Sequence, residues 1–184
     1  MSKVKETFKN ITNKIATTTK ETKETVKRLS HRTMNDLIRN YLNARLNGSE
    51  SQYINDIITS LQEEARIYSN EENVNTVQQL IFINLIGYDT TWADFTVLEV
   101  MTLDDYSAKR IAYTAAAQMW NSNSDVVLMA TNRIQRDLTS VNTLLTSCVL
   151  TSLPPYLTTA LASGISHDVI SLMTSAKPYI RQKA

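Results

Sequence analysis

Hydrophobic and polar residues alternate along most of this chain with the three- and four-residue spacing of an amphipathic helix. One segment carries this spacing clearly, with apolar residues at Val74, Val77, Leu80, Ile81, Leu85 and Ile86. It predicts a helix with one strongly apolar face. Gly87 follows directly, where a left-handed helix end is least costly for a residue without a Cβ.

A second helix is predicted immediately after this glycine. Thr91 and Asp94 have the spacing of a capping box. The buried face of the helix would consist of Trp92, Phe95, Val97, Leu98 and Met101. The stretch therefore predicts two helices joined by a tight glycine turn.

Similar start and stop signals recur on both sides of this hairpin. Gly48 ends a predicted helix over residues 34–46, and Ser49 opens another that runs to about residue 68. Asp104 is the expected cap of a helix containing AKRIAYTAAAQMW, and Ser124 that of one containing VVLMATNRIQRDL.

Prolines mark the last two helix boundaries. Pro154 and Pro155 interrupt a helix, and Pro178 suits the first turn of a final one. No stretch has the sustained two-residue alternation of a strand. Residues 34–184 therefore predict an all-α fold of about nine helices, paired every 35–45 residues or so. This organisation is typical of a HEAT- or armadillo-like α-solenoid of antiparallel helix pairs.

Four blocks, in this order, resemble the N-terminal trunk of the large adaptins, the large chains of the adaptor complexes of coated vesicles: LIGYDTTWADFTVLEVM, AKRIAYTAA, DVVLMATNRIQRDL and SLMTSAKPYIRQKA. The first block is most similar to the delta class, through Trp92, Ala93, Phe95, Glu99, Val100 and Met101. Gamma- and alpha-adaptins usually lack the Trp-Ala pair, and they are the alternative within the family.

The resemblance divides the chain in two. Residues 33–184 are expected to be the start of an adaptin-type solenoid, truncated at its C-terminal end because the family continues past the last block. Residues 1–32 form a basic, Thr-rich extension, in which residues 1–30 hold seven Lys, one Arg and three Glu. A mobile tail, a partner-binding helix and an amphipathic helix on an anionic membrane all fit this composition.

Composition argues against several functions. The net charge of +1 implies no general attraction to nucleic acid. Cys148 is the only cysteine, so there is no intramolecular disulfide, and its apolar neighbours predict a buried thiol. His31 and His167 are the only histidines, and His167 is expected to lie at a helix start. We expect no enzyme activity, metal or cofactor, because no site criteria converge.

The resemblance implies a non-enzymatic adaptor subunit that sorts cargo from Golgi or endosomes toward lysosomes or vacuoles. It would lie in the cytoplasm, peripherally on these membranes and on coated vesicles. Implied partners are a sigma-type small subunit, a beta-type large chain, a mu-type medium chain, an Arf-type GTPase and cargo tails. A generic α-solenoid scaffold is the alternative, since this fold does not specify function.

The resemblance also implies a site on the first helix. The family's cargo-binding arginine is expected at Leu42, while Arg39 matches the first basic position of the family pattern. Leucine cannot replace the bidentate carboxylate contact of an arginine. The cargo and small-subunit interface is expected to contain Arg39, Tyr41, Leu42, Arg45, Tyr53 and Ile57. A solvated helix face is the other interpretation of Arg39 and Arg45.

A second set of basic residues is expected to face a membrane or the GTPase. It consists of Lys109, Arg110, Arg133 and Arg136. For Lys109 the plainer interpretation is a stem packed beside Tyr113 with its charge in solvent. Residues 73–79, which carry a phosphoinositide patch in alpha-adaptins, contain no basic residue. Specific headgroup binding is therefore not expected there.

Overall fold

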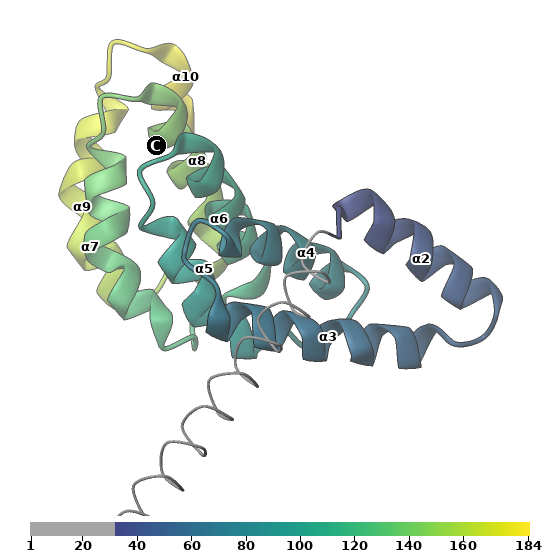
Figure 1. Cartoon of the computed structure of the whole chain (residues 1–184). Coiled ribbons are helices and arrows are strands. Elements are labelled where there is room, and N and C mark those ends of the chain that lie inside the picture. Colours follow the sequence, from purple (N-terminus) through teal and green to yellow (C-terminus); the bar gives the residue numbers. More distant parts are fainter. Residues whose placement is uncertain (1–31) are drawn as a thin grey trace, which may run out of the picture. The chain divides into compact units, whose positions relative to one another are not determined.

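The computed structural model describes residues 32–184, and every regular element in that range is helical (Figure 1). The predicted all-α fold is confirmed. The chain divides into two compact units, residues 1–67 and residues 68–184. The interpretations of residues 1–32 as a mobile tail, a partner-binding helix or an amphipathic helix on a membrane lie outside the described residues, except for Arg32.

The described part of the first unit is a helical hairpin of α2 (Met34–Leu46) and α3 (Glu50–Ile67). A capping box starts α2, because Thr33 Oγ1 accepts the Asp36 N–H at 3.2 Å and the Asp36 carboxylate accepts the Thr33 N–H at 3.2 Å. The core of the hairpin contains Leu37, Ile54 and Leu61, each without solvent exposure.

The turn between these helices is built on Gly48. Its φ of +71° lies in the left-handed region. The N–H of Gly48 donates to the carbonyl of Arg45 at 3.2 Å, and that of Ser49 donates to Ala44 at 2.9 Å. These two bonds form a Schellman motif, which satisfies carbonyls that the helix end leaves without partners.

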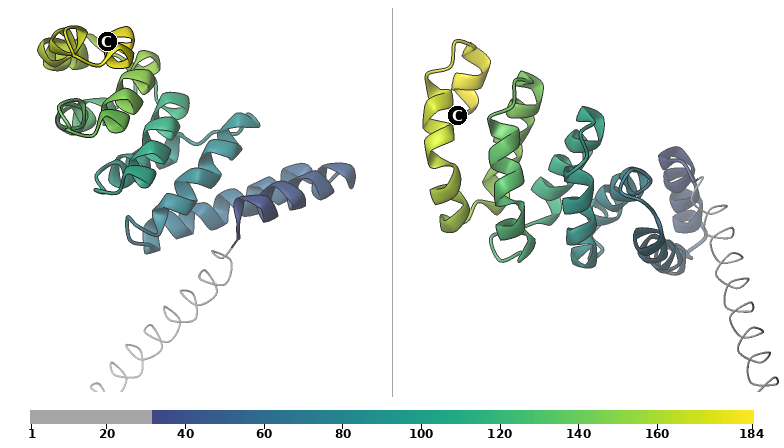
Figure 2. Two further views of the ribbon diagram at one scale, coloured as in Figure 1. Left: turned by 90° about the horizontal axis from the view of Figure 1, so that it is seen from above. Right: turned by 60° about the vertical axis from the view of Figure 1, so that its left-hand side comes forward.

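The second unit consists of seven α-helices and two short 3₁₀ turns. They are α4 (Asn73–Leu85), η1 (Thr91–Ala93), α5 (Asp94–Met101), α6 (Tyr106–Met119), α7 (Val126–Leu138), α8 (Thr143–Ser152), η2 (Pro154–Tyr156), α9 (Thr159–Met173) and α10 (Pro178–Lys183). Helices α5, α7 and α9 form one layer, and α4, α6, α8 and α10 form the other (Figure 2). The antiparallel pairs α5/α6, α7/α8 and α9/α10 join the layers, as the α-solenoid prediction requires.

Gly87 ends α4 as the sequence predicts. Its φ is +95°. The Gly87 N–H donates to Asn84 at 2.9 Å and the Tyr88 N–H donates to Ile83 at 3.2 Å, which is the hydrogen-bond pattern of the Gly48 turn. Leu85, expected on the apolar face, is 68% exposed, and Ile83 is the buried residue of that turn.

The predicted capping box of the next helix is wrong. The hydroxyl and the N–H of Thr91 both donate to the Asp89 carboxylate, at 2.9 and 3.0 Å, and these bonds lower the pKa of Asp89. Thr91 thus opens η1, and α5 begins at Asp94 without a side-chain cap. Phe95, expected on the buried face, is 51% exposed, whereas Val97 and Met101 are buried as predicted.

Two further caps and two polar residues differ from expectation. The cap of α6 is Asp105, not Asp104, because the Asp105 carboxylate accepts the Ala108 N–H at 2.8 Å. Ser124 accepts a bond from the Asn121 N–H, and the N-cap of α7 is Asp125, which makes no side-chain cap bond. His167 lies in the second half of α9 rather than at a helix start, and Cys148 is half-buried rather than buried.

Candidate interaction surfaces

Three of the predicted interface residues lie exposed along α2. Leu42 is 51% exposed, and Arg39 and Arg45 are exposed three residues before and after it. Both guanidinium groups face carboxylates of the same hairpin: Arg39 lies 3.4 Å from Asp36, and Arg45 lies 4.0 Å from Glu50. We call Arg39, Leu42 and Arg45 the α2 surface.

The other three predicted interface residues belong partly to the core. Tyr41 is 7% exposed and its hydroxyl donates to the Glu50 carboxylate at 2.8 Å, so it ties α2 to α3. Ile57 is 4% exposed. Tyr53 is half-buried, and its hydroxyl has no hydrogen-bond partner among the described residues. Of these three, Tyr53 is the one with surface left for a partner.

A buried charged cluster connects α6 and α7 in the second unit, and sequence reasoning missed it. The Asp137 carboxylate accepts from Lys109 Nζ at 2.6 Å and from the Tyr113 hydroxyl at 2.8 Å, while Arg133 Nε lies 3.4 Å away. The Lys109 and Asp137 side chains are only 6% and 2% exposed. Burial, followed by the charge of Asp137, raises the pKa of Tyr113.

This cluster corrects the interpretation of Lys109. The lysine was expected to keep its charge in solvent, but its ammonium group is buried against Asp137. A buried ammonium is tolerated because its charge is paired and hydrogen-bonded. Lys109 therefore offers no charge to a membrane or a GTPase in this structure.

Arg133 extends from the cluster to the surface. Its guanidinium donates to the carbonyl of Leu103 at 3.2 Å and lies 3.6 Å from the exposed Asp104 carboxylate. Two carboxylates and a carbonyl thus hold its orientation. Arg136, one turn further along α7, is exposed, and no ion pair or hydrogen bond of its guanidinium is formed within residues 32–184.

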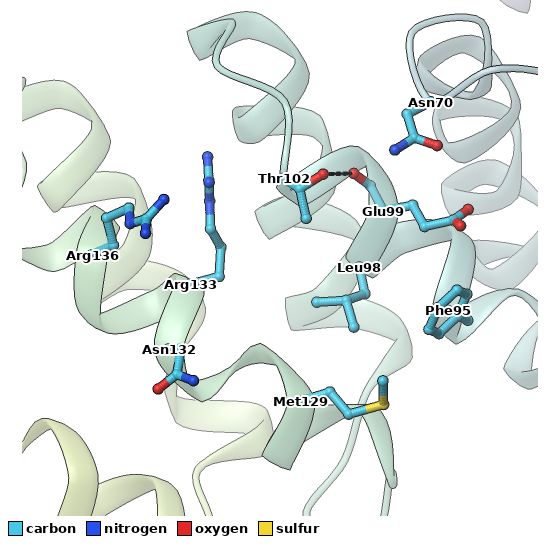
Figure 3. A pocket seen from close by; sticks show the side chains of 9 residues that line it. All are labelled: Asn70, Phe95, Leu98, Glu99, Thr102, Met129, Asn132, Arg133 and Arg136. Atoms are coloured by element: carbon cyan, nitrogen blue, oxygen red, sulfur yellow. Dashed lines mark hydrogen bonds between the residues drawn. The ribbon is translucent and has the colours of Figure 1, made fainter.

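A groove of about 450 Å³ separates α5 from α7 on this side of the unit (Figure 3). Its apolar residues are Phe95, Leu98 and Met129, of which Met129 is 60% exposed. Its polar residues are Asn70, Glu99, Thr102, Asn132, Arg133 and Arg136. The two arginines project from α7, and Glu99 projects from α5. We call this cavity the α5–α7 groove.

Arg110 lies at a different groove, between α6, α8 and α10. That groove is lined by Arg110 together with Tyr106, Leu144, Cys148 and Tyr179. Burial raises the pKa of the Cys148 thiol, which makes the thiolate scarce at neutral pH. The four basic residues expected on one surface are therefore divided between a buried cluster and two grooves.

The described residues do not meet the requirements of a metal site or of a membrane-spanning helix. No group of three or more His, Cys, Asp or Glu side chains in this range could hold a metal ion. None of the described helices combines the length and the apolar character needed to cross a bilayer. Within residues 73–79, Asn73, Thr76 and Gln79 are buried, so few side chains there face solvent.

The chain is similar to known adaptins over most of its length. Residues 49–184 match the family described as the adaptin N terminal region. AP-3 complex subunit delta-1 of Bos taurus is 34% identical over 165 residues, covering 90% of this chain and 14% of that protein. AP-3 complex subunit delta of Dictyostelium discoideum is 36% identical over 153 residues, covering 83% of this chain and 13% of that protein.

Two further comparisons agree on the class and the fold. AP-1 complex subunit gamma of Dictyostelium discoideum is 27% identical over 154 residues, so the delta subunits above are more similar. The structure described as a homology model of the full-length AP-3 complex in an intermediate open conformation matches with a TM-score of 0.55 and 31% identity. That match covers 62% of this chain and 20% of that chain.

These comparisons confirm the resemblance to the delta class. The chain spans 13–14% of the length of the two delta subunits. The family match covers residues 49–184, and the helix pairs of the second unit have the arrangement expected of such a solenoid. The chain belongs to the adaptin N-terminal region family.

Proposed function

We propose that this chain acts as the N-terminal part of the large, delta-type subunit of an AP-3-like adaptor complex. Its role would be non-enzymatic, in vesicle-mediated transport of cargo from Golgi or endosomes toward lysosomes or vacuoles. The observation that carries the proposal is the similarity to AP-3 delta subunits over 83–90% of the chain. The paired helices support it, because solenoids present extended surfaces to partner proteins.

The proposed partners are a sigma-type small subunit, a beta-type large chain and a mu-type medium chain. The sigma subunit would dock on the first hairpin, beside the α2 surface and Tyr53. Tyr53 suits an interface because its half-buried aromatic ring still has surface that a partner can cover, and aromatic rings are enriched among the residues that anchor interfaces.

Co-expression tests this assembly. A sigma-type subunit should copurify with the chain and increase its soluble yield, and Tyr53→Asp should remove that gain. Tyr179→Asp is the matched control, because Tyr179 is 56% exposed and lies on α10 of the other unit. Equal complex yields for the two variants would place the interface elsewhere.

We also propose that the α2 surface contacts acidic dileucine cargo tails weakly. Leu42 stands where the family has an arginine, and the neighbouring Arg39 and Arg45 already face Asp36 and Glu50. A charge-assisted contact to a carboxylate is worth about 1.5–3 kcal/mol, or one to two orders of magnitude in affinity. Leu42→Arg should therefore tighten binding of such a peptide about 10- to 100-fold in the presence of sigma.

Arg39→Ala and Arg45→Ala complete this test. Either variant should weaken binding of the peptide only if that arginine compensates for the leucine at position 42. The same affinity for the wild type and all three variants would exclude the α2 surface from cargo recognition.

An Arf-type GTPase is a further proposed partner, through Arg110 or Arg136. These two are the exposed members of the basic set. A generic α-solenoid scaffold is the competing function. Mass spectrometry of chains that copurify from cells distinguishes the two, since only an adaptor would bring sigma-, mu- and beta-type chains.

A further inference from the structure

The α5–α7 groove has an apolar end and a basic end. Phe95 and Leu98 precede Glu99 on α5 and Thr102 at its C-cap, and Met129 precedes Arg133 and Arg136 on α7. Figure 3 shows Phe95 and Met129 together at one end, and the two arginines nearer the other. The two helices therefore present the same order of apolar and polar positions to the groove.

The exposed apolar side chains of this groove are costly in water. Phe95 is 51% exposed and Met129 is 60% exposed, although they lie on facing helices. Covering such side chains stabilises a complex by about 25 cal/mol for each Å² of apolar surface removed from water. An apolar ligand side chain would fill this end of the groove.

The basic end of the groove, with Arg133 and Arg136, favours a ligand that carries a carboxylate. Asp137 is already matched by Lys109 and Arg133, so it does not neutralise Arg136. Arg133 is held by Asp137, Asp104 and the Leu103 carbonyl, and its side chain is 14% exposed, while the exposed Arg136 is free to close on a ligand. Glu99 stands on the opposite wall and repels an anion there, so the carboxylate would lie on the α7 side.

The separation of the two ends sets the ligand's shape. Met129 and Arg136 are seven residues apart on α7, about 10 Å at the α-helical rise. Three residues of extended chain cover about the same distance. A two-turn ligand helix, itself 10–12 Å wide, would occupy roughly twice the groove volume. The groove therefore fits a short extended segment.

We propose that the α5–α7 groove binds a linear peptide with a carboxylate three residues from a large apolar side chain. The apolar side chain lies against Phe95, Leu98 and Met129, and the carboxylate contacts Arg136, beside Arg133. This site lies in the second unit, on residues separate from the α2 surface. It goes beyond the proposed function and does not depend on a sigma subunit.

Fluorescence anisotropy with the 184-residue chain alone tests the proposal. The probes are two labelled eight-residue peptides, one with Asp three residues before Phe and one with Phe three residues before Asp, each with an Asn-for-Asp version. At least one acidic peptide should bind, and its Asn version should bind about 10-fold more weakly or worse.

Variants locate the site. Arg136→Glu and Met129→Lys should each weaken the acidic peptide by about 10-fold or more. Arg110→Glu is the matched control: it makes the same charge change on an exposed arginine of the same unit, and should change affinity by less than about twofold. Both Arg136 and Met129 are exposed, so circular dichroism should show folded proteins.

Three results would overturn the proposal. One is no binding of either acidic peptide at 1 mM. Another is equal affinity for the Asp and Asn peptides. The third is binding of phosphatidylserine vesicles that Arg136→Glu abolishes while peptide binding is unaffected, because Arg136 would then serve a membrane.

Discussion

The cationic side chains of the two units differ in burial, although the described part of each unit is built from packed helices and contains a glycine turn with the same hydrogen-bond pattern. On α2, Arg39 and Arg45 are exposed and face carboxylates at 3.4 and 4.0 Å. In the second unit, Lys109 is buried and its ammonium lies 2.6 Å from Asp137. Water screens the ion pairs of Arg39 and Arg45. The Lys109–Asp137 pair is buried, where a charge without a partner is very costly. The burial of the carboxylate, rather than the number of ion pairs, decides what a cation contributes.

The largest effect is expected from removing the buried carboxylate. Asp137→Ala leaves the Lys109 ammonium and the Tyr113 hydroxyl without their acceptor, which should lower the free energy of unfolding by about 3–5 kcal/mol. Urea denaturation followed by circular dichroism measures this loss.

Asp104→Ala is the control for that variant. Asp104 pairs with the same Arg133 but its side chain is fully exposed, so its loss should lower the free energy of unfolding far less than the loss of Asp137. Similar costs for the two variants would mean that burial does not distinguish these carboxylates.

A backbone comparison gives the next largest effect. Gly87→Ala should cost about 1–2 kcal/mol, because φ is +95° and the new Cβ has open space but a strained backbone. Gly164→Ala, inside α9, should be close to neutral. There the gain in helix propensity of about 1 kcal/mol opposes a 3.2 Å contact with Thr131 Cγ2.

Thermal melts of the two alanine variants measure the difference. Gly164→Ala would become the costlier one only if the Thr131 methyl group could not move aside. That outcome would mean that the steric cost of a methyl group between α7 and α9 exceeds the cost of the strained backbone at Gly87.

Asp94 shows what a partly buried carboxylate does without a cation. Desolvation raises its pKa to about 6 from 3.8, with Asp89 adding to the rise and a bond to Ser124 opposing it. Asp94 is the first residue of α5, where the helix dipole favours a negative charge, so desolvation exceeds that benefit. The folded state binds the proton more tightly than the unfolded state, so stability falls as pH rises from about 4 to 6.

Asp94→Asn should remove that pH dependence. We expect it to raise the free energy of unfolding by about 1 kcal/mol at pH 7.5, after allowing for solvent screening of a half-exposed group, and by less at pH 4.5. Melting temperatures measured between pH 4.5 and 8 check this result. A gain that does not change with pH would assign the effect to packing rather than ionisation.

The smallest effect is expected on α2. Arg39→Ala and Arg45→Ala should each change stability by less than about 0.5 kcal/mol, and 0.5 M salt should reduce the difference further. A cost above 1 kcal/mol for either would contradict the view that these arginines are available to a partner.

The helices could be predicted from sequence because local signals set them. The Gly48 and Gly87 turns require only a residue that readily adopts positive φ. A proline interrupts a helix through its own ring and its missing N–H, without help from distant residues. The caps depend on more than the residue type: Asp104 and Asp105 are adjacent, and both can accept the first N–H groups of α6. The Thr91 hydroxyl donates to the carboxylate of the preceding Asp89 and does not cap α5.

The buried cluster could not be predicted from local pattern alone. Asp137 follows Ala130 and Ile134 on the apolar face of α7, so a carboxylate in an apolar stripe was the signal that a buried cation must match it. Nothing in the sequence named Lys109 as that cation, because the pairing depends on how α6 packs on α7. The exposure of Phe95 also depends on packing, since α5 is only eight residues long and α7 leaves the α5–α7 groove open.

The burial of Lys109 has a consequence for chemical labelling. Among the lysines of residues 32–184, Lys177 and Lys183 are exposed at the C-terminal end and accessible to amine-directed reagents, acetyltransferases and ubiquitin ligases. The Lys109 side chain is only 6% exposed and its Nζ lies 2.6 Å from the Asp137 carboxylate, so these reagents and enzymes cannot reach it in the packed structure. Any modification detected at Lys109 would therefore report that α6 and α7 had separated, which makes this lysine an internal reporter of opening in the second unit.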